Sequence, residues 1–205
     1  MSHYFTNDNI KSKLEKRIVK VSNKTFSFNT DNGVFSKRGM DFGSRTLVDT
    51  LLKENISGDL LDVGCGYGVI GIILSSFFDI CVDMVDVNKR ALHLANMNIK
   101  ENRVSNIKAM ISDCYSNITK KYDVIVTNPP IRAGKDIVYK ILFEAKDYLK
   151  ENGRLYFVIN KDQGAKSAIK DLEKVASVEV LEKNKGFFVI KCIFDWQFDI
   201  FVVII

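Results

Sequence analysis

The stretch Leu60-Leu61-Asp62-Val63-Gly64-Cys65-Gly66-Tyr67-Gly68 joins a short apolar run to a loop in which every second residue is glycine. The apolar run is typical of a buried β-strand, and Val69-Ile70 begins the apolar face of a helix directly after the loop. A strand, a glycine-rich turn and a helix in this order are typical of a nucleotide-binding α/β unit. Because ligands bind at the carboxyl ends of parallel strands, we expect this loop to lie in a ligand site.

Strand-like and helix-like segments alternate after this stretch, which predicts a mostly parallel, doubly wound α/β sheet. Strands are predicted at 60–63, 80–85, 107–111, 122–127, 154–159, 178–181 and 187–194. Helices are predicted at 70–77, 90–101, 137–149 and 165–175, with a further helix beginning after Ser44, its expected N-cap. Gly71 is expected to let the helix after the glycine loop pack closely against the sheet.

The 205 residues suit one domain with a small addition. Residues 1–40 are predicted to form an N-terminal appendage, because 17–21 and 25–28 alternate apolar and polar residues as a β-hairpin does. Residues 41–193 are expected to form the cofactor-binding catalytic domain. Residues 194–205 are aromatic and β-branched without positive charge, and they are interpreted as an apolar tail of unassigned role: an added edge strand, a cover for a partner and an adventitious sticky end all fit it.

Composition bounds the function. The net charge of +5 suits an RNA-facing surface without requiring one, since scattered surface charge explains it equally well. The cysteines and histidines are too widely spaced for a zinc site or a disulfide framework, so we expect no metal. No signal-like or membrane-length apolar run is present, so we expect a cytoplasmic protein that does not bind membranes.

The glycine loop by itself fits two cofactors. Gly66-x-Gly68-x-x-Gly71 matches the dinucleotide fingerprint, but there the first glycine follows the strand at once, and here that glycine is Gly64. Asp62 would repel a pyrophosphate, whereas its carboxylate suits the cationic amino-acid end of S-adenosylmethionine. We therefore predict S-adenosylmethionine, with a tight turn that binds no ligand as the simpler alternative. The predicted contacts in this segment are Asp62, Gly64, Cys65, Gly66 and Gly68.

Two acids follow the next two strands. Asp86 lies about twenty residues past the glycines, where a carboxylate can accept hydrogen bonds from both ribose hydroxyls. Asp113 is placed to contact an adenine edge, although a lone aspartate there also fits a turn. Val87 and Cys114 adjoin these acids and are included in the predicted cofactor site. Asn88 is expected to cap the following helix.

Asn128-Pro129-Pro130 ends the apolar run 122–127, at the same edge of the sheet as the glycine loop. An exocyclic amine conjugated to a ring is a poor nucleophile, because its lone pair is delocalised. The Asn128 side-chain carbonyl and the Pro129 backbone carbonyl can accept its two N–H groups and aim the lone pair at a methyl group, while tandem prolines keep the loop rigid. We predict catalysis by positioning, with Asn128, Pro129 and Pro130 catalytic and Asn128 also at the cofactor. Taken alone, Pro-Pro can simply end a strand.

Ile131-Arg132-Ala133-Gly134-Lys135 continues this loop. Arg132 and Lys135 are candidates for binding RNA phosphates beside a base flipped out of its stack, and they are equally well explained as solvated loop charges. Ile131 is a candidate apolar contact for the base.

The residues above resemble the bacterial small-subunit ribosomal RNA guanine-N2 methyltransferase C family, in its short single-domain form, over residues 3 to about 193. The resemblance rests on His3-Tyr4-Phe5, Gly33-Val34-Phe35-Ser36, Asp41-Phe42-Gly43-Ser44, residues 62–68, Asn128-Pro129-Pro130, Lys161-Asp162-Gln163-Gly164-Ala165 and Lys185-Gly186-Phe187-Phe188. It implies a seven-stranded, Rossmann-like class I methyltransferase sheet and methyl transfer to guanine N2 in small-subunit ribosomal RNA, with that RNA or the small subunit as partner.

The resemblance also implies site residues. Phe35, Asp41 and Ser44 are expected over the methionine end of the cofactor or beside the target base, although Phe35 also fits a core contact. Many relatives carry an aromatic residue after Asn-Pro-Pro to stack on the base, whereas this chain has Ile131. Base stacking on an aromatic ring stabilises by about 1–3 kcal/mol, and Phe35 and Tyr4 are candidates to provide it.

Other functions fit parts of the sequence. An amino methyltransferase acting on adenine N6 or on a protein glutamine amide uses the same loop, usually with an aromatic residue after the second proline. A nicotinamide-dependent oxidoreductase fits the glycines but leaves Asn128 without a role. A catalytically silent RNA-binding module is expected to have lost Asn128 or the loop glycines, and both are present.

Overall fold

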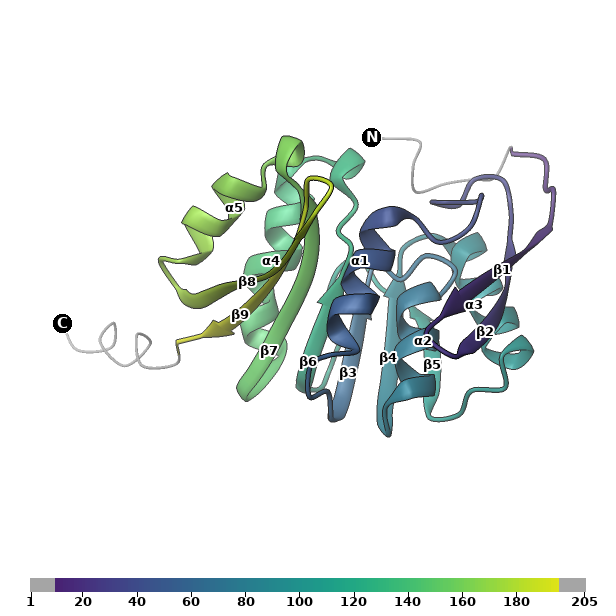
Figure 1. Ribbon diagram of the computed structural model, residues 1–205, viewed down its shortest axis with the longest axis horizontal. Coiled ribbons are helices and arrows are strands. Elements are labelled where there is room, and N and C mark those ends of the chain that lie inside the picture. The colour runs from purple at the N-terminus through teal and green to yellow at the C-terminus, as the bar shows by residue number, and fades with distance from the viewer. Residues whose placement is uncertain (1–9, 196–205) are drawn as a thin grey trace.

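The computed structural model describes residues 10–195, which form a seven-stranded sheet covered by helices, with a small N-terminal hairpin packed against the helix 89–101 (Figure 1). The motif 3–5 and all of the predicted tail beyond residue 195 lie outside the described residues. The strands are β1 (Glu15–Val21), β2 (Lys24–Thr30), β3 (Gly58–Val63), β4 (Ile80–Asp86), β5 (Ile107–Ile111), β6 (Tyr122–Thr127), β7 (Leu149–Asn160), β8 (Ala176–Asn184) and β9 (Phe187–Phe194). The helices are α1 (Phe42–Leu51), α2 (Val69–Phe77), α3 (Lys89–Glu101), α4 (Lys135–Tyr148) and α5 (Ala165–Leu172), with 3-10 turns at η1 (Ile131–Ala133) and η2 (Lys161–Gln163).

The large sheet has the strand order β5-β4-β3-β6-β7-β9-β8. The first five strands in this order run parallel, and β9 pairs antiparallel with both β7 and β8. Strands with helices on both faces need apolar side chains on both, and Leu60 and Leu61 of β3 accordingly belong to two different core clusters. The first cluster joins the sheet to α1, α2, α3 and the hairpin, and the second joins it to α4 and α5. The predicted doubly wound, mostly parallel seven-stranded fold is confirmed.

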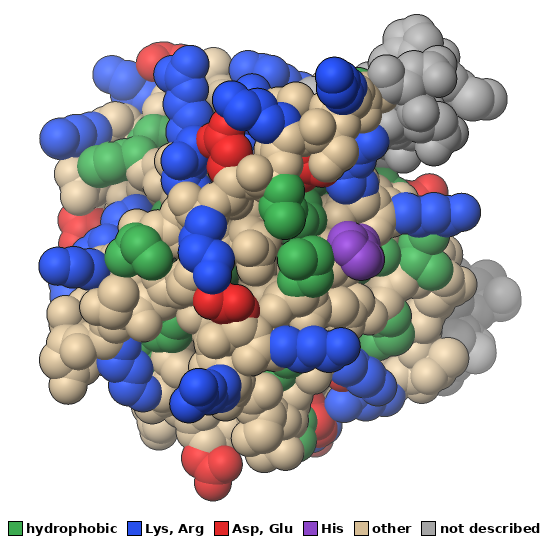
Figure 2. Space-filling view, turned by 90° about the vertical axis from the view of Figure 1, so that its right-hand side faces the viewer, with side chains coloured by type: hydrophobic (Ala, Val, Ile, Leu, Met, Phe, Trp, Pro, Cys, Tyr) green, Lys and Arg blue, Asp and Glu red, His purple; other side chains and the backbone are tan. Residues whose placement is uncertain are grey.

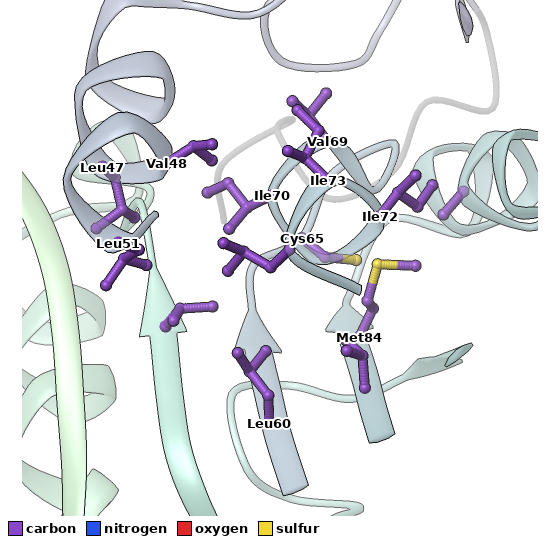
Figure 3. Packing of buried hydrophobic residues seen from close by; sticks show 14 of the residues in the cluster. Leu47, Val48, Leu51, Leu60, Cys65, Val69, Ile70, Ile72, Ile73 and Met84 are labelled. Carbon is purple, nitrogen blue, oxygen red and sulfur yellow. The ribbon is translucent and has the colours of Figure 1, made fainter. Parts of the chain in front are cut away.

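The packing of α1 and α2 positions the loops above the sheet. Leu47, Val48 and Leu51 of α1 lie in one cluster with Ile70 of α2 (Figure 3). A Cβ atom on Gly71 would lie only 2.6 Å from the sulfur of Met84, so α2 approaches β4 closely because this residue is glycine, as predicted. Neither helix can shift without moving the glycine loop, which directly precedes α2.

The start of α1 differs from the prediction. The N-cap is Asp41, whose carboxylate accepts a hydrogen bond from the backbone N–H of Ser44 at 3.1 Å, and the helix begins at Phe42. Ser44 is therefore inside the first turn and not the cap. Aspartate is as good an N-cap as serine, and the apolar residues that suggested a later start begin only one turn further on.

The strands that exceed their predicted lengths the most are β7 and β8. β7 begins at Leu149, where the chain is already extended, so α4 ends at Tyr148. Asn152 adopts a left-handed conformation (φ 61°) and the pairing with β6 shifts register there, so a turn-like sequence is accommodated within the strand. β8 begins at Ala176 and runs to Asn184, because its polar end pairs with β9.

The predicted N-terminal hairpin is present as β1 and β2, joined by a short turn. Its Val19, Val21, Phe26 and Phe28 are buried in the same cluster as the helices α1 to α3. The domain boundary at residue 40 stays a prediction, but the buried side chains of the hairpin belong to the same hydrophobic core as those of the helices and the large sheet.

Two asparagines, one in α3 and one that caps its C-terminal end, hold the hairpin in place. The Asn98 amide accepts a hydrogen bond from the backbone N–H of Asn29 at 2.7 Å and donates to the carbonyls of Asn29 and Tyr67 at 3.1 and 2.9 Å. One turn further along, the Asn102 amide accepts from the N–H of Ser27 at 2.9 Å and donates to its carbonyl at 2.8 Å. Because Tyr67 belongs to the glycine loop, Asn98 joins the hairpin to that loop.

Asn98→Ala is expected to lower the free energy of unfolding by about 2–4 kcal/mol, because it leaves buried backbone groups of Asn29 and Tyr67 without partners. Urea denaturation measures this difference. Asn96→Ala is the matched control on the same helix, since Asn96 is exposed and donates only to Leu92 within the helix. A loss of about 0.5 kcal/mol or less is expected there. Equal losses for the two variants would refute the bridging role of Asn98.

Candidate active site

A cavity of about 560 Å³ opens at the carboxyl ends of β3, β4 and β6. Its walls come from the glycine loop, the turns after β4, β5 and β6, and the segment between β2 and α1. A volume of this size suits a small-molecule ligand. The predicted site residues that line it are Phe35, Asp41, Ser44, Gly64, Cys65, Gly66, Asp86, Val87, Asp113, Cys114, Asn128, Pro129, Pro130, Ile131 and Arg132. The structure thus brings together fifteen of the predicted residues, from five separate segments.

The glycine loop is held open by backbone geometry. Gly64, Gly66 and Gly68 have φ angles of 73°, 56° and 92°, a region in which residues with a Cβ are strained. The backbone N–H groups of Gly64 and Cys65 both donate to the carbonyl of Val85, which fixes the loop against β4. Gly68 does not line the cavity but is the N-cap residue of α2. Its contribution is to start the helix.

Asp62 was predicted to contact the cofactor directly, but its side chain lies beneath the loop and is not part of the cavity wall. The side chain is completely buried, and its Oδ2 accepts the backbone N–H of Gly71 at 3.0 Å. Its Oδ1 is buried without a hydrogen-bond partner among residues 10–195. Burial raises the pKa of the Asp62 carboxyl to about 7 against the lowering effect of the Gly71 hydrogen bond, and the charge of Asp86 raises it further. The period of two along β3 places Asp62 on the face of Leu60, under α2, which is the signal that predicts this position.

The raised pKa of Asp62 predicts a pH-dependent stability. An aspartate ionises near pH 4 in the unfolded chain, so between about pH 4 and 7 the folded state retains a proton that the unfolded state has lost, and the free energy of unfolding falls as the pH rises. Asp62→Asn keeps an acceptor for Gly71 and cannot ionise. Its free energy of unfolding relative to the wild type should therefore increase by about 1–3 kcal/mol between pH 5 and 8, measured by urea denaturation without ligand. A difference that does not change with pH would show that Asp62 ionises normally.

Asp86 connects the glycine loop to the start of α3. Its two carboxylate oxygens accept the backbone N–H groups of Gly66 and Asn88, each at 2.8 Å. Burial raises the pKa of the Asp86 carboxyl, against these backbone hydrogen bonds. Asn88 caps α3, as predicted, by accepting from the N–H groups of Arg90 and Ala91. It also donates to the carbonyl of Gly33 at 3.1 Å, which ties the segment before α1 to this side of the cavity.

The turn after β5 completes this side. Asp113 is exposed, and its backbone N–H donates to the hydroxyl of Ser116 at 3.1 Å. Cys114 is buried with a φ of 50°, and burial raises the pKa of its thiol to about 12. Both residues line the cavity, so a ligand contact and a turn role are compatible for Asp113.

Asn128 is oriented by two residues at the start of α1. Its amide nitrogen donates to the hydroxyl of Ser44 at 2.9 Å and to the carboxylate of Asp41 at 3.2 Å. An ionised carboxylate only accepts hydrogen bonds, so the end of the Asn128 amide that faces Asp41 must be its nitrogen, which donates. The carbonyl oxygen of Asn128 has no hydrogen-bond partner within residues 10–195 and belongs to a residue of the cavity wall. The arrangement leaves a positioned acceptor for a ligand N–H group.

Other predicted residues take different places. Lys135 does not line the cavity, because it begins α4 and its ammonium lies 4.6 Å from the centre of the Tyr139 ring. Phe35 is 52% exposed at the cavity, so it is not the core contact that composition suggests. Further wall residues that the sequence did not assign to the site are Tyr67, Phe42, Gln163 and Phe187. Tyr67 belongs to the glycine loop, and the other three belong to motifs that carry the family resemblance, so membership of these motifs was the sequence signal that could have placed them in the site.

The charges around the loop fit a cationic ligand such as S-adenosylmethionine. The charge of the half-buried Asp86 adds to the cost of ionising the buried Asp62, and one oxygen of Asp62 has no partner in the described part of the chain. A positive ligand would relieve this cost. Elsewhere in residues 10–195, no cluster of three or more His, Cys, Asp or Glu side chains is arranged to bind a metal ion.

The sequence matches the family model described as the methyltransferase small domain over residues 25–191. The chain is 44% identical over 194 residues to Bacillus subtilis YbxB, described as an uncharacterized protein, and the match covers 92% of this chain and 96% of that one. It is 38% identical over 133 residues to ribosomal RNA small subunit methyltransferase C of Mannheimia succiniciproducens, covering 62% of this chain and 39% of that protein. The chain thus spans well under two thirds of the length of this relative.

The fold is similar to that of T. Thermophilus 16S rRNA N2 G1207 methyltransferase, solved with AdoMet and guanosine, with a TM-score of 0.80 and 22% identity over 89% of this chain and 51% of that one. The ribosomal protein L11 methylase of Lactobacillus delbrueckii has a TM-score of 0.67 at 17% identity, covering 79% and 81% of the two chains. The resemblance to the ribosomal RNA small subunit methyltransferases C is confirmed by relatives of that name. The match over residues 25–191, together with the sheet topology, shows that the chain belongs to the methyltransferase small domain family.

Proposed function

We propose that the protein transfers a methyl group from S-adenosylmethionine to the exocyclic N2 amine of a guanine in small-subunit ribosomal RNA. The methyl donor is S-adenosylmethionine, as in the methyltransferases to which this chain is related. The observation that carries the amine assignment is the Asn128 amide, which Asp41 and Ser44 hold with its carbonyl oxygen free. The relatives named methyltransferase C support the RNA substrate.

The cofactor side would be formed by the glycine loop and Asp86. S-adenosylmethionine supplies an electrophilic methyl group on a positively charged sulfur. Asp86 keeps acceptor capacity beyond its bonds to Gly66 and Asn88, so it can bind the ribose hydroxyls. The carboxylate of Asp86 lines the cavity and favours a cation there, and a bound cation would in turn favour ionisation of Asp62 beneath the loop. Asp113 lies on the wall where an adenine edge can reach it.

The acceptor side would be formed by Asn128 and Pro129. The Asn128 carbonyl oxygen and the Pro129 backbone carbonyl accept the two N–H groups of the amine and direct its lone pair. Because Asp41 and Ser44 already satisfy the Asn128 amide nitrogen, the residue does not reorganise when the amine binds. The amine loses its proton after methyl transfer, so no strong base is required.

An RNA substrate needs a cationic surface near the cavity. Figure 2 shows one side of the molecule, where Lys and Arg side chains are spread among acidic and apolar ones and do not form one block. Arg132 lines the cavity itself and is exposed.

No helix within residues 10–195 is long and apolar enough to cross a membrane.

Methyl transfer to adenine N6 or to a glutamine amide stays the alternative, because both amines suit the same pair of acceptors. The test is transfer from tritiated S-adenosylmethionine to ribosomal subunits and total RNA from cells that lack the protein, with nucleoside analysis. N2-methylguanosine in small-subunit RNA is the expected product. Label in methyladenosine or in protein would overturn the guanine assignment, and the absence of label despite tight cofactor binding would overturn the activity on these substrates.

A further inference from the structure

Phe42 is an exposed aromatic residue beside the proposed acceptor for the amine. Its side chain is 37% exposed and lines the cavity. It lies between Asp41 and Ser44, the two residues that hold the Asn128 amide. An exposed ring in a cavity wall is a flat apolar surface of the kind on which bases stack.

The Phe42 ring packs against a second aromatic ring of the cavity wall. The Phe187 ring lies 5.6 Å from it, centre to centre, at an angle of 51°. A Cβ atom on Gly43 would lie 3.0 Å from the Phe187 ring, so α1 and β9 are in close contact here. Phe187 directly follows a two-residue hairpin turn, Lys185-Gly186, in which both residues have positive φ (45° and 84°), as in a type I′ turn. This turn fixes where β9 begins and with it the position of Phe187.

The same turn places unpaired positive charge at the cavity rim. The ammonium of Lys185 lies over the Phe42 ring, 5.2 Å from its centre, in a cation–π contact that a stacking base would replace. The backbone N–H of Lys161 donates to the carbonyl of Gly186 at 2.8 Å, and Lys183 lies over the Phe188 ring at 5.1 Å. None of these three lysines forms an ion pair within residues 10–195, whereas Lys150 and Lys191 do. A cation without a carboxylate partner is available to a phosphate.

Phe35 is the competing aromatic residue, at 52% exposure in the same cavity. Its neighbours connect it to the cofactor side. The carbonyl of Ser36 accepts the Tyr67 hydroxyl at 3.2 Å, and the carbonyl of Gly33 accepts the Asn88 amide at 3.1 Å. Phe42 is instead adjacent in sequence to the residues that bind Asn128, so it belongs to the acceptor side.

We propose that Phe42 is the ring on which the methyl-accepting base stacks and that Lys185 is the cation beside the phosphate of that nucleotide. The proposal rests on the proposed function and names the substrate contacts of that site. Phe42 belongs to α1 and Lys185 to the β8–β9 turn, so the nucleotide would contact two segments that lie far apart in the sequence. Ile131 then needs only to provide an apolar contact in the cavity wall.

The test measures binding of guanosine to the full chain saturated with S-adenosylhomocysteine, by NMR titration. Phe42→Leu, which keeps the apolar bulk, should weaken guanosine binding about 5- to 150-fold, and Phe42→Trp should stay within about threefold of the wild type. Phe143→Leu on α4 is the control for the same change in side chain outside the cavity. Lys185→Gln should leave guanosine binding unchanged and weaken binding of guanosine 3′,5′-bisphosphate about 3- to 10-fold, more at low salt. Lys100→Gln, at the far end of α3, is its control.

The affinity for S-adenosylhomocysteine reports the fold of each variant and should stay within about threefold. Unchanged guanosine affinity in Phe42→Leu, or a loss confined to Phe35→Leu, would overturn the stacking role and leave the proposed function intact. If Phe42→Leu also loses the cofactor, the proposal is judged on Phe42→Trp, which must keep guanosine binding, and on Lys185→Gln, which must weaken binding of the bisphosphate. Equal effects of Lys185→Gln and Lys100→Gln would refute the phosphate contact. Wild-type binding of adenosine instead of guanosine, with the same dependence on Phe42, would support stacking and overturn the guanine assignment.

Discussion

Asn128→Ala is expected to lower the single-turnover rate of methyl transfer by about 10²–10³-fold while the affinity for S-adenosylhomocysteine changes only a few-fold. The side chain supplies one of two acceptors that direct the amine, and losing one preorganised polar group of an active site typically costs this much. The rate is measured with saturating tritiated S-adenosylmethionine and the RNA substrate. Turnover at the wild-type rate would rule out the amine-binding role.

The pair formed by Asp41 and Asn128 allows a sharper control. Asn128→Asp places two carboxylates where the structure has a donor and an acceptor 3.2 Å apart, so it should be nearly as inactive as Asn128→Ala. The double variant Asp41→Asn, Asn128→Asp restores a donor and an acceptor in reversed order. In the structure Oδ1 of Asp41 accepts both the backbone N–H of Ser44 and the Asn128 amide, so the new amide at position 41 must keep its oxygen on Ser44, which preserves the cap of α1, and turn its nitrogen towards position 128. Recovery of about tenfold or more over Asn128→Asp is expected, and a double variant no better than the single one would refute the anchoring by Asp41.

Asp86→Ala is expected to raise the dissociation constant of S-adenosylhomocysteine by about 100-fold or more. The carboxylate would bind the ribose hydroxyls, and it also holds the N–H groups of Gly66 and Asn88, so its loss removes a ligand contact and loosens the loop together. Isothermal titration calorimetry measures this constant. Asp79→Ala is the control, since Asp79 is exposed and outside the cavity. An unchanged constant for Asp86→Ala would remove this residue from the cofactor site.

Much of the fold follows from local pattern. The predicted limits of β5, β6 and β9 agree with the structure, because each is an apolar or alternating run bounded by polar or turn residues. β7 was harder, since its first residues include Asn152 and Gly153, which suggest a turn and are absorbed by an irregularity in the pairing with β6. A local pattern does not show that the neighbouring strand tolerates such a shift.

The site was predictable where it depends on motifs and unpredictable where it depends on contacts between them. The glycine loop, Asp86 and Asn128 are recognisable because their chemistry is local to strand ends. The bond from Asn128 to Asp41 joins residues 87 positions apart, and the contact of Phe42 with Phe187 joins α1 to β9. No periodicity reports such pairs. Asp62 is a third case. An aspartate at this position suits a cationic ligand, but its side chain lies beneath the loop and accepts the backbone N–H of Gly71.

Asn98 of α3 and its C-cap residue, Asn102, have a consequence beyond stability. In a two-stranded sheet, the outward N–H and C=O groups of each strand are a template to which a strand of another molecule can add. On β2 these are the groups of Ser27 and Asn29, two residues apart and therefore on the same edge. Asn98 and Asn102 present an acceptor and a donor to each, as an adjoining strand would. Two amide side chains thus close an edge that would otherwise promote self-association, and the hairpin can stay a small sheet without recruiting a third strand.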